Sequence, residues 1–278
     1  MSERLPSGLH IVATPIGNLG DLSPRAADTL RRADRILAED TRVTAKLLNH
    51  IGAKVPTSRF DGHTSELERE RIVDQLGDQA IALVSDAGTP LISDPGYKLV
   101  RAARAAGRPV HTVPGPSAAI AALTLAGLPT DRFLFLGFLP AKRKARGDSI
   151  ADIAGVRATL VIYESGPRLA GTLAALEELL GPRDAAVVRE ISKLYEECVT
   201  GTLSELAKSY AAASTAKGEI VIVVGPPREV DCASDDELDA ALEEALGRLS
   251  PSRAAAEVSE RLNVPRKRAY ARALERSK

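Results

Sequence analysis

The stretch that decides the fold class runs from Leu9-His10-Ile11-Val12-Ala13-Thr14 through a glycine-containing loop to Ser23-Pro24. The apolar run has the length of a buried strand. The serine is a good helix N-cap, and proline suits the first position of a helix. Short β-branched runs alternate with helical patterns in this way up to residue 126, which is typical of βαβ units. We therefore predict an α/β domain with a parallel sheet over residues 1–128.

The elements expected in this first domain follow from its apolar runs and from the residues that start and stop helices. Ser65 and Glu68 have the spacing of a capping box, and Gly52 and Gly77 follow expected helix ends. The expected strands are residues 9–14, 35–39, 55–60, 80–85 and 109–113, and the expected helices are residues 24–33, 41–50, 65–76, 97–106 and 117–126.

The pattern of strands and helices changes from Asp131 onward. The run that ends at Glu190 and the run that starts at Tyr195 are too close for a crossover helix, so we expect these two strands to be antiparallel. The expected strands are residues 133–138, 159–164, 185–190, 195–200 and 219–224, and the expected helices are residues 167–180 and 203–213. This pattern predicts a second α/β domain with a mixed sheet over residues 129–227.

The composition shifts again after residue 227. Residues 228–247 carry eight acidic residues and one basic residue, whereas residues 251–278 carry eight basic and three acidic residues. Helical patterns at 253–262 and 266–275 have the spacing of a helix-turn-helix. We predict a small helical domain over residues 228–278, and a solvated amphipathic tail is the alternative.

Length and composition bound the class of protein. At ~150 residues per domain, 278 residues make about two domains, and 44% hydrophobic residues exclude global disorder. The 37 Lys and Arg residues balance the 37 Asp and Glu residues, so a polyanionic partner would have to meet a local basic patch. The only cysteines, Cys198 and Cys232, argue against a disulfide framework and favour a cytoplasmic protein. Prolines and glycines interrupt the longest uncharged stretch, residues 111–130, so we expect no membrane span.

Three loops at the ends of predicted parallel strands suit a ligand, because ligands of open parallel sheets bind at that edge. The loops are Thr14–Asp21, Ser85–Gly96 and Val113–Ser117. The second loop carries Asp86 and Asp94 beside glycines that allow close approach of the backbone. Such residues are also common in turns without function. Together, however, the three loops favour a polar, nucleoside-like ligand held mainly by backbone groups.

Other kinds of site find little support in the sequence. The chain has no G-x-G-x-x-G or G-K-[ST] phosphate loop and no G-x-S-x-G nucleophile turn. His10, His50, His63 and His111 lack the spacing of metal ligands, so we expect no metal.

The ligand loops belong to a larger set of motifs. The set comprises Val12-Ala13-Thr14-Pro15-Ile16-Gly17-Asn18-Leu19-Gly20-Asp21, Ala38-Glu39-Asp40-Thr41-Arg42, Ser85-Asp86-Ala87-Gly88-Thr89-Pro90, Ile92-Ser93-Asp94-Pro95-Gly96 and Pro114-Gly115-Pro116-Ser117-Ala118. These motifs resemble the tetrapyrrole-methylase superfamily of S-adenosylmethionine enzymes. Within it they are similar to the branch that methylates a cytidine 2′-hydroxyl in the decoding region of small-subunit ribosomal RNA. The resemblance covers about residues 8–225, and the tail resembles the small helical domain of this branch.

The resemblance implies two α/β domains of tetrapyrrole-methylase type, a cytoplasmic homodimer, and S-adenosylmethionine in the cleft between the domains. The implied cofactor contacts are Pro15, Asp86, Ala87, Gly88, Ser117, Ala118, Tyr163, Lys217 and Gly218. One departure concerns Gly166-Pro167-Arg168, because related sequences usually have Pro-His-Arg there. Any role of a histidine at that place is therefore absent or is taken by another group.

The implied reaction requires an acceptor hydroxyl about 3 Å from the methyl carbon, together with a base or a charge that stabilises the developing alkoxide. The candidates for this chemistry are Asp40, Glu190 and Lys193, with Glu39 as a further carboxylate. Arg42 is a candidate for an electrostatic or phosphate contact. A structural ion-pair network is the alternative for each of them.

Two basic patches indicate an RNA partner, because phosphate backbones require local positive charge. The candidate RNA contacts, besides Arg42, are Lys142, Arg143, Lys144, Arg146, Arg266, Lys267 and Arg268. The resemblance implies that this partner is the RNA of the small ribosomal subunit. Two other functions stay open: a corrinoid or porphyrin C-methyltransferase, and a noncatalytic RNA-binding ribosome assembly factor.

Overall fold

The computed structural model describes residues 4–213, 215–227, 235–262 and 264–277. After Pro227 the chain divides into two compact units, which we name the body and the tail unit. Cys232 and the first residues of the predicted tail domain, 228–234, lie outside the described residues. None of the described helices combines the length and apolar character that crossing a membrane requires.

The first sheet of the body is parallel throughout, as predicted, with the strand order β3-β2-β4-β1-β5. Its strands are β1 (Gly8–Val12), β2 (Arg35–Ala38), β3 (Thr57–Arg59), β4 (Ala80–Val84) and β5 (Val110–Val113). Its helices are α1 (Pro24–Arg32), α2 (Thr41–His50), α3 (Glu66–Gln75) and α4 (Tyr97–Ala105). The most central strand, β4, is buried along its whole length.

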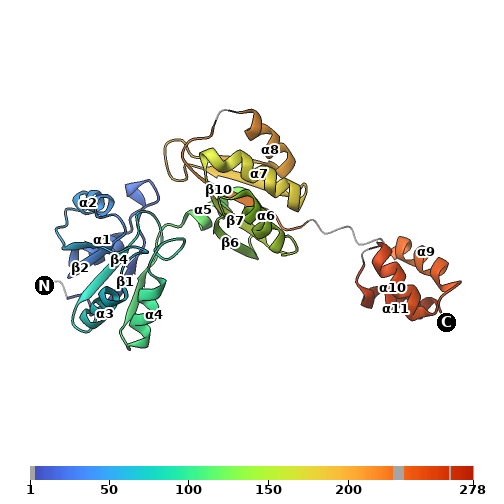
Figure 1. The fold of residues 1–278 in the computed structure, drawn as a ribbon, viewed down its shortest axis with the longest axis horizontal. Helices are drawn as coiled ribbons and strands as arrows, with labels where there is room; N and C mark the ends of the chain where they lie inside the picture. The colour runs from blue at the N-terminus through green and yellow to red at the C-terminus, as the bar shows by residue number, and fades with distance from the viewer. Residues whose placement is uncertain (1–3, 214, 228–234, 263, 278) are drawn as a thin grey trace. The chain divides into compact units, whose positions relative to one another are not determined.

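Helices cover both faces of this sheet (Figure 1). Leu30 of α1 and Leu47 of α2 pack with the side chains of β2 and β4 that point to one face. Ile72 of α3 and Leu99 of α4 pack on the other face. Burial on both faces explains why the central strand β4 reads as a continuous apolar run rather than as an alternating pattern.

The second sheet is mixed, as predicted, with the order β6-β7-β10-β8-β9. Its strands are β6 (Phe133–Phe138), β7 (Thr159–Ser165), β8 (Asp184–Arg189), β9 (Glu197–Thr202) and β10 (Glu219–Val224). Only β6 and β7 pair in parallel, and the predicted antiparallel pairing of β8 with β9 is confirmed. Helices α6 (Arg143–Asp152), α7 (Gly166–Leu180) and α8 (Leu203–Ala212) cover one face through an apolar core.

Helix α5 (Ala118–Ala126) covers the other face of the second sheet, although it directly follows a strand of the first sheet. Ala119, Ala122 and Leu123 pack there against Val161, Val188 and Val221. The short segment between β5 and α5 therefore joins the two halves of the body, and the helix itself packs on the second sheet (Figure 1).

Several expected elements differ from the structure. The strand expected at 195–200 lies two residues later, because residues 190–196 form a loop. Helix α6 was not predicted; it holds most of the basic run, and Ile150 is its buried residue. The expected capping box is incomplete. Ser65 accepts a hydrogen bond from the Glu68 backbone, but the Glu68 carboxylate lies near Arg35 and Arg71, whose charges compete for it.

The described part of the tail unit is a three-helix bundle of α9 (Asp235–Leu246), α10 (Pro251–Leu262) and α11 (Arg266–Arg276). Leu238 and Leu242 of α9 pack with Val258 of α10 and Ala269 of α11. The first of these helices was not predicted, although its apolar residues have helical spacing. Every core residue of α11 is alanine, so the helices can approach closely.

Candidate functional site

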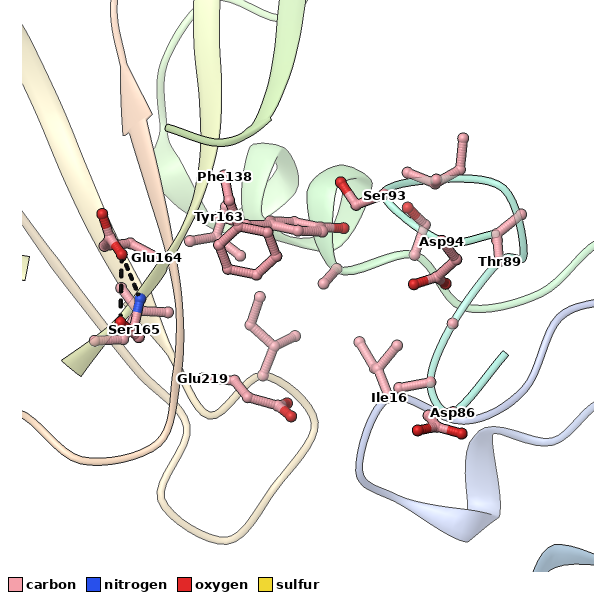
Figure 2. A pocket seen from close by; sticks show the side chains of 18 of the residues that line it. Ile16, Asp86, Thr89, Ser93, Asp94, Phe138, Tyr163, Glu164, Ser165 and Glu219 are labelled. Carbon is pink, nitrogen blue, oxygen red and sulfur yellow. Dashed lines mark hydrogen bonds between the residues drawn. The ribbon is translucent and has the colours of Figure 1, made fainter. Parts of the chain in front are cut away.

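A cavity of about 410 Å³ opens at the carboxyl ends of β2 and β4, between the two sheets of the body. One wall comes from the first half of the body and includes Ile16, Asp86 and Asp94. The opposite wall comes from the second sheet and includes Tyr163 and Glu219. Figure 2 shows these side chains facing one another across the cavity.

The first wall is fixed by its own backbone. Thr14 and Gly88 exchange two backbone hydrogen bonds, of 2.9 and 3.1 Å, which join the loop after β1 to the loop after β4. Gly88 has φ +76°, and an added Cβ would lie 3.2 Å from Ile16. A side chain there would be strained and would crowd the wall, so the sequence needs glycine at this position.

Three carboxylates lie along this wall: Glu39, Asp86 and Asp94. None of the three forms an ion pair with any residue that the structure describes. Burial and the nearby charges of Asp94 and Asp86 raise the pKa of Glu39 above its ordinary value. Burial, together with the charge of Asp86, likewise raises the pKa of Asp94. Because unpaired, crowded carboxylates gain from a nearby positive charge, this wall suits a cationic ligand.

The second wall is aromatic. Tyr163 makes edge contacts with Phe135 and Phe138, at centroid distances of 4.9 and 5.6 Å. Its hydroxyl accepts a hydrogen bond of 3.2 Å from the backbone N–H of Ala119, in the first turn of α5. Burial raises the pKa of Tyr163, so the hydroxyl stays protonated at neutral pH. The second wall therefore offers an apolar surface with one hydroxyl group beside the N-terminus of α5.

A buried carboxylate supports this wall from behind. The side chain of Glu164 is fully buried; it accepts hydrogen bonds of 2.8 Å from the Ser165 backbone and 2.7 Å from the Thr172 hydroxyl. Arg168 lies 3.3 Å from the same carboxylate and donates a bond of 2.6 Å to the Leu139 carbonyl. These contacts tie β7, α7 and the segment after β6 into one unit.

Lys193 connects the two halves of the body. Its ammonium donates hydrogen bonds to Glu190 at 3.0 Å and to Glu219 at 2.9 Å. Its stem lies so close to Gly17 that a Cβ there would lie 2.4 Å from the Lys193 Cε. Beside Lys193, the Ser192 hydroxyl donates a hydrogen bond to Asp21 in the loop after β1, which adds a second contact between the two halves.

The electrostatics around Lys193 set its charge state. Burial acts to lower the pKa of Lys193, but the hydrogen bonds to Glu219 and Glu190 outweigh it, so the pKa is raised. The backbone N–H of Glu219 and the ammonium of Lys193 lower the pKa of Glu190. Glu190 and Ser192 also have positive φ values, 51° and 67°, which non-glycine residues rarely adopt. A loop strained in this way and held by ion pairs is typical of a functional site.

Lys193 also lines a second cavity, of about 360 Å³, beside the first. The two cavities share Ile16, Asp86, Ala87 and Glu219. Thr44 and Lys46 of α2 form the far side of the second cavity. The site is therefore a pair of adjoining pockets, with Asp86 and Glu219 at their common edge.

The loop at residues 216–218 depends on two glycines. An added Cβ at Gly218, which has φ +95°, would lie 2.4 Å from the Glu190 carboxylate. An added Cβ at Gly166 would lie 1.7 Å from the carbonyl oxygen of Ala216. Only glycine at position 166 leaves room for this loop. The departure at Gly166-Pro167 therefore lies where α7 and this loop pack closely together.

The structure places the candidate cofactor residues around the two cavities. Asp86, Ala87, Gly88, Ser117, Ala118, Tyr163 and Gly218 line the first cavity, and Pro15 lines the second. Lys217 lines neither cavity, and its carbonyl accepts a hydrogen bond from Arg189. Several lining residues were missed by sequence reasoning, among them Phe138, Glu164 and Glu219; only contacts between segments distant in sequence bring them here.

The candidate catalytic and RNA-binding residues separate into different places. Asp40 lines neither cavity; it caps α2, and the bound guanidinium of Arg42, 2.6 Å away, holds the pKa of Asp40 well below its usual range. Lys142, Arg143 and Lys144 are exposed, whereas Arg146 is half-buried beside Gly171. Arg268 pairs with Asp235 inside the tail unit.

Two family models match the chain. Residues 8–207 match the model of the tetrapyrrole (corrin/porphyrin) methylases. The chain belongs to this family. Residues 233–277 match the model of the RsmI C-terminal HTH domain. Membership of the methylase family makes the chain a methyltransferase whose cofactor is S-adenosylmethionine.

Relatives in this family extend over nearly the whole chain. The chain is 54% identical to "Ribosomal RNA small subunit methyltransferase I" of Erythrobacter litoralis, over 99% of the chain and 97% of the relative. It is 49% identical to the protein of the same name from Xylella fastidiosa (strain Temecula1), over 95% of the chain and 98% of the relative.

Solved structures share the methylase fold at lower identity. A diphthine synthase aligns with a TM-score of 0.62 and 15% identity, over 78% of this chain and 89% of that chain. A uroporphyrin-III C-methyltransferase from Thermus thermophilus aligns with a TM-score of 0.55 and 21% identity, over 78% of this chain and 93% of that chain. At these identities the likeness concerns the fold.

The first cavity fits the cofactor of this family. Its volume of about 410 Å³ lies in the usual range of small-molecule pockets. S-adenosylmethionine carries positive charges on its sulfonium and ammonium groups, and the unpaired carboxylates of the first wall suit both. Tyr163 and Phe138 offer the apolar surface that a purine requires.

Proposed function

We propose that the protein transfers a methyl group to the 2′-hydroxyl of a cytidine ribose in the decoding region of small-subunit ribosomal RNA. The observation that carries this proposal is the match, at 54% identity, to a protein named for small-subunit ribosomal RNA methylation. That match spans both the body and the tail unit, since it covers 99% of the chain.

S-adenosylmethionine, when bound, supplies an activated methyl group to an oxygen nucleophile. In this proposal the residues of the first cavity hold that cofactor, and the second cavity receives the ribose. Lys46 and Lys193 line the second cavity and supply positive charge for the RNA backbone. The common edge of the two pockets at Asp86 and Glu219 is then where the two ligands meet.

The proton chemistry follows from the charge states around this edge. Lys193 keeps its proton at neutral pH, so it acts by stabilising negative charge that develops on the ribose oxygen rather than by removing a proton. Glu190 and Glu219 hold the Lys193 ammonium in place. A low pKa and the contact with Arg42 make Asp40 a weak base. Glu39 has a raised pKa but lines only the first cavity, so in this proposal it faces the cofactor rather than the ribose hydroxyl.

Single-turnover methylation of small ribosomal subunits that lack the modification tests this proposal. With labelled S-adenosylmethionine, we expect Lys193→Met to slow the reaction roughly 10²- to 10³-fold, the usual loss when one oxyanion donor is removed. We expect Asp40→Asn to have little effect. Unchanged rates for variants of Lys193, Asp40 and Glu190 alike would overturn the assignment of this site.

The corrinoid or porphyrin C-methyltransferase is the competing activity. Its acceptor is a large apolar macrocycle, so it needs neither the basic residues of α6 nor the tail unit. Transfer to tetrapyrrole precursors, without transfer to ribosomal subunits, would favour it. Tight cofactor binding with transfer to neither acceptor would favour a noncatalytic assembly factor.

We also infer a homodimer, which the family resemblance implies. Ile120 and Leu125 on α5 and Phe133 on β6 support it, because these large apolar side chains are 39–49% exposed. Sedimentation equilibrium of the full chain tests it, and a monomer at micromolar concentration would contradict it.

A further inference from the structure

The tail unit has two faces of different charge. On one face, Arg268, Arg272 and Arg276 of α11 stand one turn apart and pair with Asp235, Asp239 and Glu243 of α9. Asp239 is the centre of this row, since it binds both Arg272 and Arg276 at 2.6 Å. These three arginines are therefore engaged within the tail unit and hold its helices together.

The opposite side of α11 has no such partners. At about 100° per residue, Lys267, Tyr270 and Leu274 lie on one stripe, roughly opposite the arginine row. Arg266 lies at the edge of this stripe, in the first turn of the helix. We name these four residues the α11 outer face. The side chains of Arg266 and Lys267 form no ion pair and no hydrogen bond with any residue that the structure describes.

The α11 outer face combines free positive charge with an exposed aromatic ring. Tyr270 is 42% exposed and Leu274 is 43% exposed, so both side chains are accessible to a ligand. The helix contains no acidic residue before Glu275, and Glu275 lies near Arg272 on the other side. The first turn of α11 adds the positive end of the helix dipole, because no side chain caps it.

We propose that the α11 outer face binds an unpaired segment of the RNA substrate, with Arg266 and Lys267 on phosphates and the Tyr270 ring stacked on a base. Proteins recognise single-stranded RNA in this way, by cations along the backbone and aromatic rings on the bases. The proposal rests on the proposed function, and it replaces Arg268 with Tyr270 among the residues that contact RNA. A single stacking residue agrees with a chain that has no tryptophan and only 3% aromatic residues.

Binding of a fluorescein-labelled RNA of the decoding region to the full-length protein, over a series of salt concentrations, tests this proposal. We expect Tyr270→Ala to weaken binding about 5- to 100-fold, and Tyr270→Phe to bind like the parent protein because it keeps the ring. We expect Lys267→Ala to reduce the slope of log K against log salt by about 0.7, the value for one phosphate contact on a single strand. Arg253→Ala, which removes an exposed, unpaired charge from α10, is the matched control and should change neither quantity by as much.

The outcomes separate this proposal from its alternatives. Unchanged affinity and slope for both Tyr270→Ala and Lys267→Ala would overturn it. If Tyr270→Ala instead changed the sedimentation coefficient of the RNA-free protein and left RNA binding intact, the face would contact the body or a second chain, and the proposal would be wrong. Hydrogen exchange over α9–α11 verifies that each variant keeps its fold. A parent protein that binds the RNA through this face but methylates no ribosomal subunit would refute the proposed function and not this inference.

Discussion

Glu39, Asp86 and Asp94 lie on the wall of the first cavity, whereas Asp235, Asp239 and Glu243 lie along α9, and the two clusters differ in the cations beside them. The cavity carboxylates have no ion-pair partner among the described residues, and the pKa values of Glu39 and Asp94 are raised. The α9 carboxylates each meet an arginine of α11, and the pKa values of Asp235 and Asp239 are lowered.

This difference teaches that the presence of an ion-pair partner, and not the number of acidic residues, separates the carboxylates of a ligand site from those that stabilise the fold. A carboxylate without an ion-pair partner can bind a cationic ligand with a gain in electrostatic free energy. A carboxylate that is already paired within the protein stabilises the fold instead. Four measurements would break or sharpen this comparison.

The largest effect is expected at Glu164, a paired and buried carboxylate that lines the same cavity on the wall opposite the unpaired cluster (Figure 2). Glu164→Ala removes the partner of Arg168 and leaves Thr172 without its acceptor. We expect the free energy of unfolding in urea to fall by about 3 kcal/mol, the lower end for breaking a buried pair, because Arg168 stays partly exposed. Glu178→Ala, at an exposed position of α7, the helix that carries Arg168 and Thr172, is the control. Equal stability of the two variants would break the rule that pairing marks structural acids.

The next effect concerns the unpaired cluster. The double substitution Glu39→Gln with Asp94→Asn keeps the shape of the wall and removes two charges. Calorimetry should show S-adenosylmethionine binding about 10- to 100-fold more weakly, since hydrogen bonds to charged groups contribute roughly 1.5–3 kcal/mol. The free energy of unfolding should stay the same or rise, because crowded carboxylates repel each other. Asp28→Asn, an exposed residue paired with Arg32 on α1, should leave cofactor affinity unchanged.

A third measurement uses pH. The raised pKa values of Glu39 and Asp94 mean that the free protein takes up protons above the ordinary values of 4.5 and 3.8. A cationic cofactor favours the ionised forms, so its affinity should fall as pH is lowered, by at most tenfold per pH unit for each linked proton. The same groups favour the folded state below their unfolded pKa and lose this contribution as pH rises through the folded pKa. Calorimetry from pH 8 to pH 4 in buffers of different ionisation enthalpy would measure the proton release. Affinity that stays flat down to pH 4 would contradict the assignment.

The smallest effect is expected in the tail unit. Asp239→Asn removes the charge shared by Arg272 and Arg276. Because its folded pKa is lowered, Asp239 stabilises the fold above its unfolded pKa and loses this contribution as pH falls through the folded value. At neutral pH we expect faster hydrogen exchange in α9 and α11 and no change in cofactor affinity. Glu260→Gln, on the exposed side of α10, is the control, and exchange that is equal in both variants would show that the row contributes little.

The sequence predicts the first sheet well because its strands are buried on both faces. The run at β4 is apolar over its whole length, and β1 and β2 each contain a single polar or charged side chain, His10 and Arg35. The helix at Arg143–Asp152 was missed for the opposite reason: it contains a glycine and five charged residues, and Ile150 alone is buried on it. Tertiary packing of one side chain, rather than a periodic pattern, stabilises that helix.

The candidate site could be predicted only in part. The loops after β1 and β4 contain glycines next to carboxylates, and this pattern predicted Asp86 and Gly88 as site residues. The role of Glu164 could not be predicted from the sequence of its own strand. Its carboxylate is buried because Thr172 and Arg168 of the following helix bind it, and these contacts are visible only in the structure. Arg268 looked like the other tail cations in the sequence; its pairing with Asp235 spans 33 residues.

Helix α5 has a consequence for how the body forms during synthesis. Its apolar side chains pack on Val188 and Val221, which the ribosome adds some 60 to 100 residues after the helix itself. Until β10 has left the exit tunnel, the apolar face of α5 on the emerging first half is therefore exposed, because the sheet that covers it is incomplete. A chain that stalls or is cut within this interval presents that surface to chaperones and to its own copies.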